Sequence, residues 1–323
     1  MHRSLPLALV TALLLTGTAN AAPSVVASIK PVHSLVAAVM EGVGEPTLLV
    51  KGNASPHTYA LRPSDAGALQ NADLVFWTGH GLELFLADAL ETLSIDATVV
   101  ELAETPGVTL LPVREGGAFE AHEHEGEGHD HAHEEEGHEE HGHDEEDGHE
   151  HEEGDMHFWL DPQNAKAMVS LIAETLSEAD PENAKAYAAN AERELTELDA
   201  LTAEIEETVA PVADRPFIVF HDAYQYFENR FGLTVAGSIT VSPEVMPGAQ
   251  RINELNARVA ELDAACVFAE PQFEPTIISA ITGGTGARTG VLDPEAGLLT
   301  EGPDLYPELL RGIAASLVDC LGE

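Results

Sequence analysis

Residues 181–209 have the sequence PENAKAYAANAERELTELDALTAEIEETV, which predicts one unbroken helix of about 29 residues. At ~1.5 Å per residue this helix would be ~43 Å long. We expect Asp180 to cap its first amide groups and Pro181 to occupy the first helical position, where the missing N–H costs nothing. Apolar residues at three- and four-residue steps predict a buried stripe along one side, made of Ala184, Ala188, Ala191, Leu195, Leu198, Ile205 and Val209. Pro211 predicts the end of the helix.

On both sides of this helix, short β-rich runs alternate with helical patterns. The predicted strands are 24–29, 47–50, 73–77 and 98–100 before it, and 217–220, 233–239, 265–269 and 289–292 after it. Such alternation is typical of parallel sheets covered by helices. We therefore expect an α/β fold of two lobes, each a mainly parallel sheet flanked by helices, joined by one long rigid helix. The alternative is one large domain that carries a long surface helix.

The expected domain limits follow from these patterns. An N-terminal α/β lobe covers residues 22–117 and resumes at 155–180, the linking helix covers 181–210, and the C-terminal α/β lobe covers 211–323.

The first 21 residues have the pattern of a secretory signal peptide. A short basic start precedes an apolar run from Leu5 to Leu15, and small residues predict cleavage after Ala21. The apolar run is too short to span a bilayer. We expect a protein exported to the periplasm. Because there is no cysteine near the cleavage site to carry a lipid, we expect a free protein and not a lipoprotein.

The chain is strongly acidic, and its histidines are concentrated in one segment. The net charge of −43 argues against nucleic acid or an anionic membrane surface as a partner. Residues 118–154 hold ten histidines among many Glu, Asp and Gly residues, with almost no apolar residues. We expect this segment to be disordered and to bind metal weakly at several sites. The alternative is a solubilising insert.

The sequence contains two cysteines, Cys266 and Cys320. Because export places them in an oxidising compartment, we expect them to form a disulfide that joins the last helix to a strand of the second lobe. Closing such a loop contributes about 4 kcal/mol in the chain-entropy model. Two separate buried thiols are the alternative.

Three histidines outside the acidic segment are candidate metal ligands. His57 and His221 follow predicted strands, and His157 precedes a predicted helix. In open α/β sheets, ligands bind beyond the carboxyl ends of the strands. Asp293, directly after another predicted strand, is a fourth candidate. Three imidazoles with one open or carboxylate position form an ordinary Zn²⁺ shell.

The motifs around these histidines resemble a known family, the metal-specific solute-binding proteins of ABC importers (cluster A-I, or cluster 9), and in particular its zinc branch. The matching segments are Ser-Pro-His57-Thr-Tyr59, Leu61-Arg62-Pro63-Ser64-Asp65, His157-Phe-Trp-Leu-Asp161-Pro162 and His221-Asp222-Ala223-Tyr224. The resemblance implies metal in a cleft between two lobes, with His57, His157 and His221 as ligands. An imidazole at position 221, where manganese and iron carriers tend to have a carboxylate, favours Zn²⁺.

The fourth ligand stays open at this point. Some zinc members of that family have a glutamate just before the first ligand, but this chain has Pro56. Water, Asp293 or a carboxylate of the acidic segment could take the position. Asp161 could either hydrogen-bond a ligand imidazole or cap a helix. His33 and His80 are less favoured as site residues.

These observations predict a non-enzymatic periplasmic receptor that captures one tightly bound Zn²⁺ and delivers it, as a monomer, to an inner-membrane ABC permease. The histidine-rich segment would act as a low-affinity collector. A Mn²⁺ or Fe²⁺ carrier of the same family, a periplasmic zinc buffer and a zinc hydrolase are the alternatives. The sequence contains no HExxH motif, which disfavours the hydrolase.

Overall fold

The computed structural model describes residues 22–114, 119, 154–240, 248–261, 265–272 and 276–322. The predicted signal peptide and nearly all of the histidine-rich segment lie outside these residues. Among the helices within them, none is long and apolar enough to cross a membrane.

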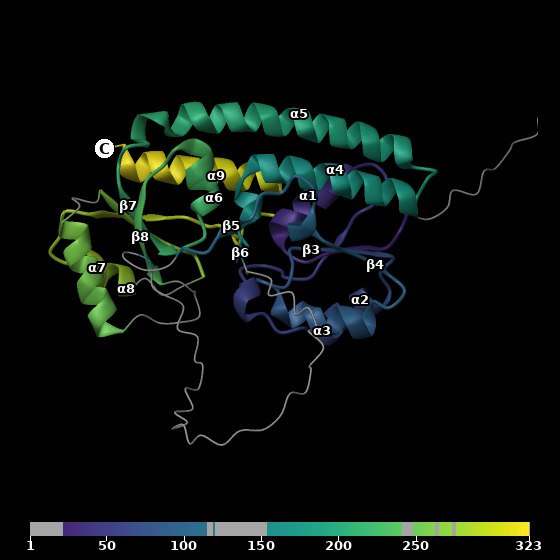
Figure 1. Ribbon diagram of the computed structural model, residues 1–323, viewed down its shortest axis with the longest axis horizontal. Coiled ribbons are helices and arrows are strands. Elements are labelled where there is room, and N and C mark those ends of the chain that lie inside the picture. The colour runs from purple at the N-terminus through teal and green to yellow at the C-terminus, as the bar shows by residue number, and fades with distance from the viewer. Residues whose placement is uncertain are drawn as a thin grey trace, which may run out of the picture.

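The N-terminal half forms a four-stranded parallel sheet in the order β2-β1-β3-β4. Its strands are β1 (Val25–Ala27), β2 (Thr47–Leu48), β3 (Leu74–Trp77) and β4 (Thr98–Glu101). Helices α1 (Lys30–Met40) and α4 (Pro162–Ala179) cover one face, and α2 (Pro63–Gln70) and α3 (Leu84–Leu93) cover the other (Figure 1). Side chains on both faces are therefore buried, as in Val25 and Val26, which belong to different apolar clusters.

The C-terminal half repeats this construction with the order β10-β9-β7-β8, again with parallel strands. Its strands are β7 (Phe217–His221), β8 (Val235–Thr240), β9 (Cys266–Ala269) and β10 (Arg288–Val291). One apolar cluster packs α7 (Ala249–Glu261) and α8 (Thr276–Thr282) on the sheet, while α6 (Gln225–Phe231) and α9 (Leu305–Leu321) lie in the main core. Each of the eight predicted strands overlaps an observed one, and the expected fold class is confirmed.

The predicted disulfide is also present. The sulfur atoms of Cys266 in β9 and Cys320 in α9 lie 2.08 Å apart, so the last helix is covalently joined to the C-terminal sheet.

The long helix α5 (Ala184–Val209) has 26 residues and packs on α1 and α4 of the first half and on α9 of the second (Figure 1). Its predicted start at Pro181 is wrong, because residues 181–183 form a turn. The Asp180 carboxylate accepts hydrogen bonds from the Asn183 side chain, at 2.7 Å, and from the Tyr187 hydroxyl, at 2.9 Å. Asp180 therefore fixes the turn before the helix and does not cap the helical amides.

The buried stripe of α5 differs from the predicted one in its first half. Ala188 is exposed, whereas Tyr187 is fully buried. Ala191, Leu198, Ile205 and Val209 are buried as expected, together with Leu201, which the prediction omitted, while Leu195 is half-buried. A large aromatic side chain at position 187 fills the space beneath the helix better than an alanine would, so it sets the register of the buried face.

A short antiparallel ribbon, which the sequence did not predict, is formed by residues that lie between β4 and α4 in the chain. It pairs β5 (Leu111–Pro112) with β6 (Gly154–Asp155). The ribbon brings the two ends of the histidine-rich insertion together, and it leads directly into His157.

Candidate metal centre

His57 lies in η1 (Pro56–Thr58), a single 3-10 turn after β2. The Ser55 hydroxyl accepts a hydrogen bond from the His57 amide at 3.3 Å, and Pro56 occupies the first position of the turn. Tyr59 donates to Asp65 Oδ2 at 2.8 Å, which also accepts from the Arg62 amide at 2.9 Å. The motif around His57 therefore anchors its turn to the start of α2.

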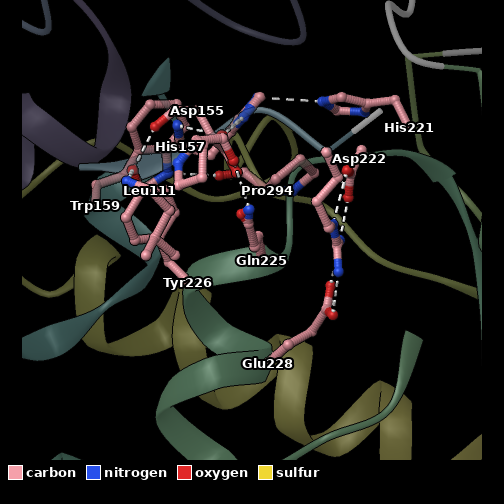
Figure 2. Close-up of polar contacts among 12 residues, drawn as sticks. Leu111, Asp155, His157, Trp159, His221, Asp222, Gln225, Tyr226, Glu228 and Pro294 are labelled. Carbon is pink, nitrogen blue, oxygen red and sulfur yellow. Dashed lines mark hydrogen bonds and ion pairs between the residues drawn. The ribbon is translucent and has the colours of Figure 1, made fainter. Parts of the chain in front are cut away.

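His157 stands between β6 and η3 (Phe158–Leu160). Asp155 Oδ1 accepts two hydrogen bonds from this residue, one from its amide at 3.0 Å and one from Nδ1 at 2.8 Å (Figure 2). Because the carboxylate accepts the Nδ1 proton, the neutral ring presents a lone pair on Nε2.

His221 is the last residue of β7, at the carboxyl end of the C-terminal sheet. Its Nδ1 donates to Glu270 Oε1 at 2.6 Å, and its amide lies 3.3 Å from the same oxygen. Glu270 directly follows the neighbouring strand β9, so the two strand ends bring the pair together. As with His157, the carboxylate leaves Nε2 available to a metal.

The three imidazoles converge. A ligand atom from each of His57, His157 and His221 lies within 4.8 Å of the other two. The Nε2 atoms of His157 and His221 are 3.2 Å apart. In a tetrahedral Zn²⁺ shell with Zn–N bonds of about 2.05 Å, neighbouring nitrogens would be about 3.3 Å apart. Two lone pairs that face each other at this distance suit a cation between them.

Two of the three histidines have perturbed pKa values, in opposite directions. Burial and the neighbouring imidazoles of His157 and His221 hold the pKa of His57 well below its ordinary value. Burial also lowers the pKa of His221, but the Glu270 carboxylate more than offsets this and raises that pKa above the ordinary value. Protons therefore compete with a metal more strongly at His221 than at His57, which stays neutral.

A buried carboxyl group lies close to this cluster. Burial raises the pKa of Glu295 to about 8, while the charge of His157 opposes the shift. The peptide next to it is fixed, since Trp159 Nε1 donates to the Pro294 carbonyl at 3.0 Å (Figure 2). Glu295 thus adds a proton-binding group near the three histidines, which the sequence alone did not indicate.

A cavity of about 180 Å³ opens onto His57 and His157. Its lining is His57, Gly81, Leu82, Val113, Arg114, Gly154, Asp155, Met156, His157 and Asp222. Pockets for organic ligands usually measure about 300 to 1,000 Å³. This one accommodates an ion and a few waters better than an organic substrate.

The other candidates lie elsewhere. Asp293 does not join the three histidines, because its Oδ1 accepts from Gln272 Nε2 at 3.2 Å and its Oδ2 from the Leu298 amide at 3.3 Å. His33 is buried and hydrogen-bonds the Pro46 carbonyl through Nε2 at 3.1 Å. His80 is exposed and pairs with Glu101.

Of the two roles left open for Asp161, the structure shows the cap. Its Oδ1 accepts from the Gln163 amide at 2.8 Å at the start of α4, and its carboxylate forms an ion pair with Arg230. Asp155 and Glu270 bind the imidazoles instead, and the sequence reasoning missed both. The strand-end rule applied to Asp293 would also have selected Glu270, which follows a predicted strand in the same way.

Comparison with known proteins agrees with this geometry. Residues 25–320 match the family described as "ZnuA: Zinc-uptake complex component A periplasmic". The chain belongs to the ZnuA family. It is 52% identical over 310 residues to the high-affinity zinc uptake system protein ZnuA of Brucella suis, which covers 93% of this chain and 92% of that protein. The ZnuA of Yersinia pestis is 39% identical over 315 residues, with 97% and 96% coverage.

Solved ZnuA structures share the fold. One, "Crystal structure of ZnuA", superposes with a TM-score of 0.73 at 26% identity and covers 93% of this chain and 99% of the other. Another, "Crystal structure of 138-173 ZnuA deletion mutant plus zinc bound", has a TM-score of 0.71 at 25% identity, with 93% and 98% coverage. The resemblance to solute-binding proteins is confirmed, and ZnuA is a non-enzymatic component of a transport system.

Proposed function

We propose that this protein is the periplasmic receptor of a zinc importer, which captures Zn²⁺ with high affinity between its two lobes and delivers it to an inner-membrane ABC permease. The observation that carries the proposal is the convergence of His57, His157 and His221 within 4.8 Å. The family membership and the zinc-uptake names of the relatives support the choice of cargo and partner.

The proposed ligands are the Nε2 atoms of His157 and His221 and one ring nitrogen of His57. Imidazole nitrogens favour Zn²⁺ over the harder Mn²⁺ and Fe²⁺ ions. We assign the fourth position to water, since both oxygens of Asp293 accept hydrogen bonds, one from the Gln272 side chain and one from the Leu298 amide. Carboxylates of the histidine-rich segment, the third possibility, lie outside the described residues.

On this proposal the bound metal joins the two lobes, 22–117 with 155–180 on one side and 211–323 on the other. His57 comes from the first and His221 from the second. Helix α5 packs against both, and Lys30 Nζ donates to the carbonyls of Gly297 at 2.8 Å and Leu299 at 3.0 Å across the same boundary. With so many fixed contacts, we expect only small lobe movements on binding.

The histidine-rich segment 118–154 is proposed to collect Zn²⁺ at low affinity near the cleft. The β5–β6 ribbon supports this, because it places both ends of the segment beside the cavity that opens onto His57 and His157. The solved ZnuA deletion mutant named above is described as zinc-bound, so that protein binds zinc without its residues 138–173. The segment would then speed loading without supplying a ligand.

Residues 1–21 are proposed to be a cleaved signal peptide, and the mature protein a periplasmic monomer. The periplasmic description of the family supports this location.

The test is a competition titration with a chelator of known zinc affinity. The wild-type protein should hold one Zn²⁺ tightly, and the triple variant His57→Ala, His157→Ala, His221→Ala should lose that site. His80→Ala serves as the control, since this exposed histidine should not affect the tight site. A triple variant that kept the tightly bound zinc would show that the protein is a buffer with its metal bound elsewhere.

A further inference from the structure

A half-buried arginine lies at the edge of the candidate metal centre. Arg114 follows β5 and forms ion pairs with two carboxylates at once, those of Asp222 and Glu228. Its Nε donates to Asp222 Oδ2 at 2.9 Å, and its Nη2 donates to Asp222 Oδ1. The same guanidinium donates to Glu228 through Nη1 at 2.8 Å and through Nη2 at 2.9 Å.

Asp222 connects these ion pairs of Arg114, which we call the clamp, to the proposed metal site. It follows His221 directly and lines the same cavity as His57 and His157. Its side chain is 7% exposed, and its charge is among the causes that raise the pKa of His221. A carboxylate is therefore present next to the proposed zinc shell, at the side where the cavity opens.

The position of this carboxylate matters because the proposed shell has three imidazoles and one open place. Carboxylate oxygen suits Mn²⁺ and Mg²⁺ better than imidazole nitrogen does, and unlike water it adds a negative charge to the shell. An Asp222 carboxylate free to turn would compete with water for that place. Arg114 opposes this rotation of the Asp222 side chain, because its guanidinium hydrogen-bonds both carboxylate oxygens and fixes their orientation.

The clamp is itself held from the other side. The aromatic ring of Phe119 lies over the guanidinium, with its centroid 4.2 Å from Arg114 Cζ. Glu228, on α6, is buried and supplies the second carboxylate, so the arginine is fixed by the C-terminal half although it comes from the ribbon.

We propose that Arg114 is a positioning residue for metal specificity, which holds Asp222 out of the coordination shell and keeps the fourth position open to water. The inference rests on the proposed function, because it presupposes the three-histidine site.

The experiment compares the affinities for Zn²⁺ and Mn²⁺ in the wild type and in Arg114→Gln. In the variant the preference for Zn²⁺ over Mn²⁺ should narrow by about tenfold, the lower end of the effect of residues that orient metal ligands. With Co²⁺ as a spectroscopic probe, the visible absorption bands should change as a carboxylate oxygen replaces water. An unchanged metal preference and an unchanged Co²⁺ spectrum would overturn the proposal.

Rescue separates this role from simple stabilisation. In the double variant Arg114→Gln, Asp222→Asn the carboxylate is absent, so the wild-type metal preference should return even if the melting temperature does not. Failure of the double variant to restore the preference would contradict the role assigned to Asp222. Arg114→Lys keeps the charge without the two-pronged geometry and should shift the preference in the same direction by less. If Arg114→Gln does not fold, Arg114→Lys provides the test. An unchanged preference for Zn²⁺ over Mn²⁺ in Arg114→Lys would then overturn the proposal.

Arg230→Gln is the matched control. Arg230 also forms a two-pronged ion pair, with Asp161, through Nε and Nη2 at 2.7 Å each, and neither residue lines the cavity. Its loss should lower stability without changing the metal preference. If the wild type itself bound no tight Zn²⁺, the proposed function would fail, whereas tight Zn²⁺ binding with an unaltered preference in Arg114→Gln would refute only this inference.

Discussion

The two sheets contain the same histidine–carboxylate pair in different surroundings. In the C-terminal sheet, His221 at the end of β7 binds Glu270 beyond the neighbouring strand β9, at 2.6 Å. In the N-terminal sheet, His80 beyond β3 binds Glu101 at the end of the neighbouring strand β4, at 3.2 Å. The side chains of the first pair are 3% and 2% exposed, and those of the second are 63% and 20% exposed.

The difference shows that a strand-end histidine with a carboxylate partner is not sufficient for a metal site. His221 lies close to two further imidazoles, whereas His80 makes a T-shaped contact with the Trp77 ring and is largely exposed to solvent. Water screens and hydrates the exposed pair, so its carboxylate does little to fix the ring. Burial and convergence with His57 and His157 distinguish the first pair.

The largest expected effect is the loss of a ligand. His221→Ala should abolish the tight Zn²⁺ site, because two imidazoles and waters hold zinc far more weakly than three imidazoles. His80→Ala should leave the affinity unchanged. Isothermal titration with a competing chelator measures both, and equal losses in the two variants would erase the distinction between the pairs.

The partner carboxylates should have an intermediate effect. Glu270→Gln should weaken Zn²⁺ binding by about 10- to 100-fold, the usual range for groups that orient metal-ligating histidines. Since Glu270 raises the pKa of His221, the zinc affinity of the variant, taken relative to its own value at high pH, should begin to fall at a lower pH than that of the wild type. Glu101→Gln is the control, and titrations between pH 5 and 8 would show whether only Glu270 shifts the profile.

Glu194, a buried carboxyl group that does not contact a histidine of the candidate site, should affect stability but not zinc binding. Burial raises the pKa of Glu194 on α5 to about 7, with further contributions from Glu197, Asp304 and Glu41 against the opposing charge of Arg193. The folded state therefore keeps a proton that the unfolded chain releases near pH 4.5, so stability should fall as the pH rises from about 4.5 to 7 and then level off.

The size of this effect is about 3 kcal/mol. Glu194→Gln should remove this part of the decline, so that the difference in stability between pH 5 and pH 8, measured by urea unfolding of metal-free protein, is smaller than in the wild type. The part due to Glu295, whose pKa is also raised, should remain. An unchanged decline in the variant would show that Glu194 is not a cause of it. Zinc affinity at pH 8 should match that of the wild type.

The fold was largely predictable from the sequence. Strand-helix alternation gave both parallel sheets, since runs such as Phe217–Phe220 are apolar throughout and must be buried on both faces. The start of α5 was not predictable, because Asp180 and Pro181 match the usual signals of a helix start. In the structure, hydrogen bonds from Asn183 and Tyr187 hold Asp180 in a turn.

The histidines of the candidate site were predictable from the sequence, but the side chains that hold the site in place were not predicted. The motifs and strand ends selected His57, His157 and His221, which the structure brings together. Arg114 is 108 residues from the Asp222 carboxylate that it holds and carries no distinguishing sequence pattern, so only the packing of the ribbon beside α6 reveals its role. Glu270 follows a predicted strand and was selectable by the strand-end rule, but it is 49 residues from His221, and only the packing of β7 beside β9 shows which group it holds.

The most direct test of the central claim measures bound zinc in two proteins, the mature wild type and a variant that lacks residues 120–153 but keeps the β5–β6 ribbon. Metal analysis and competition titration should find one tightly held Zn²⁺ in both, which excess Mn²⁺ does not displace. Loss of the tight site in the shortened protein would contradict the account, because the histidine-rich segment would then hold the metal that we assign to His57, His157 and His221.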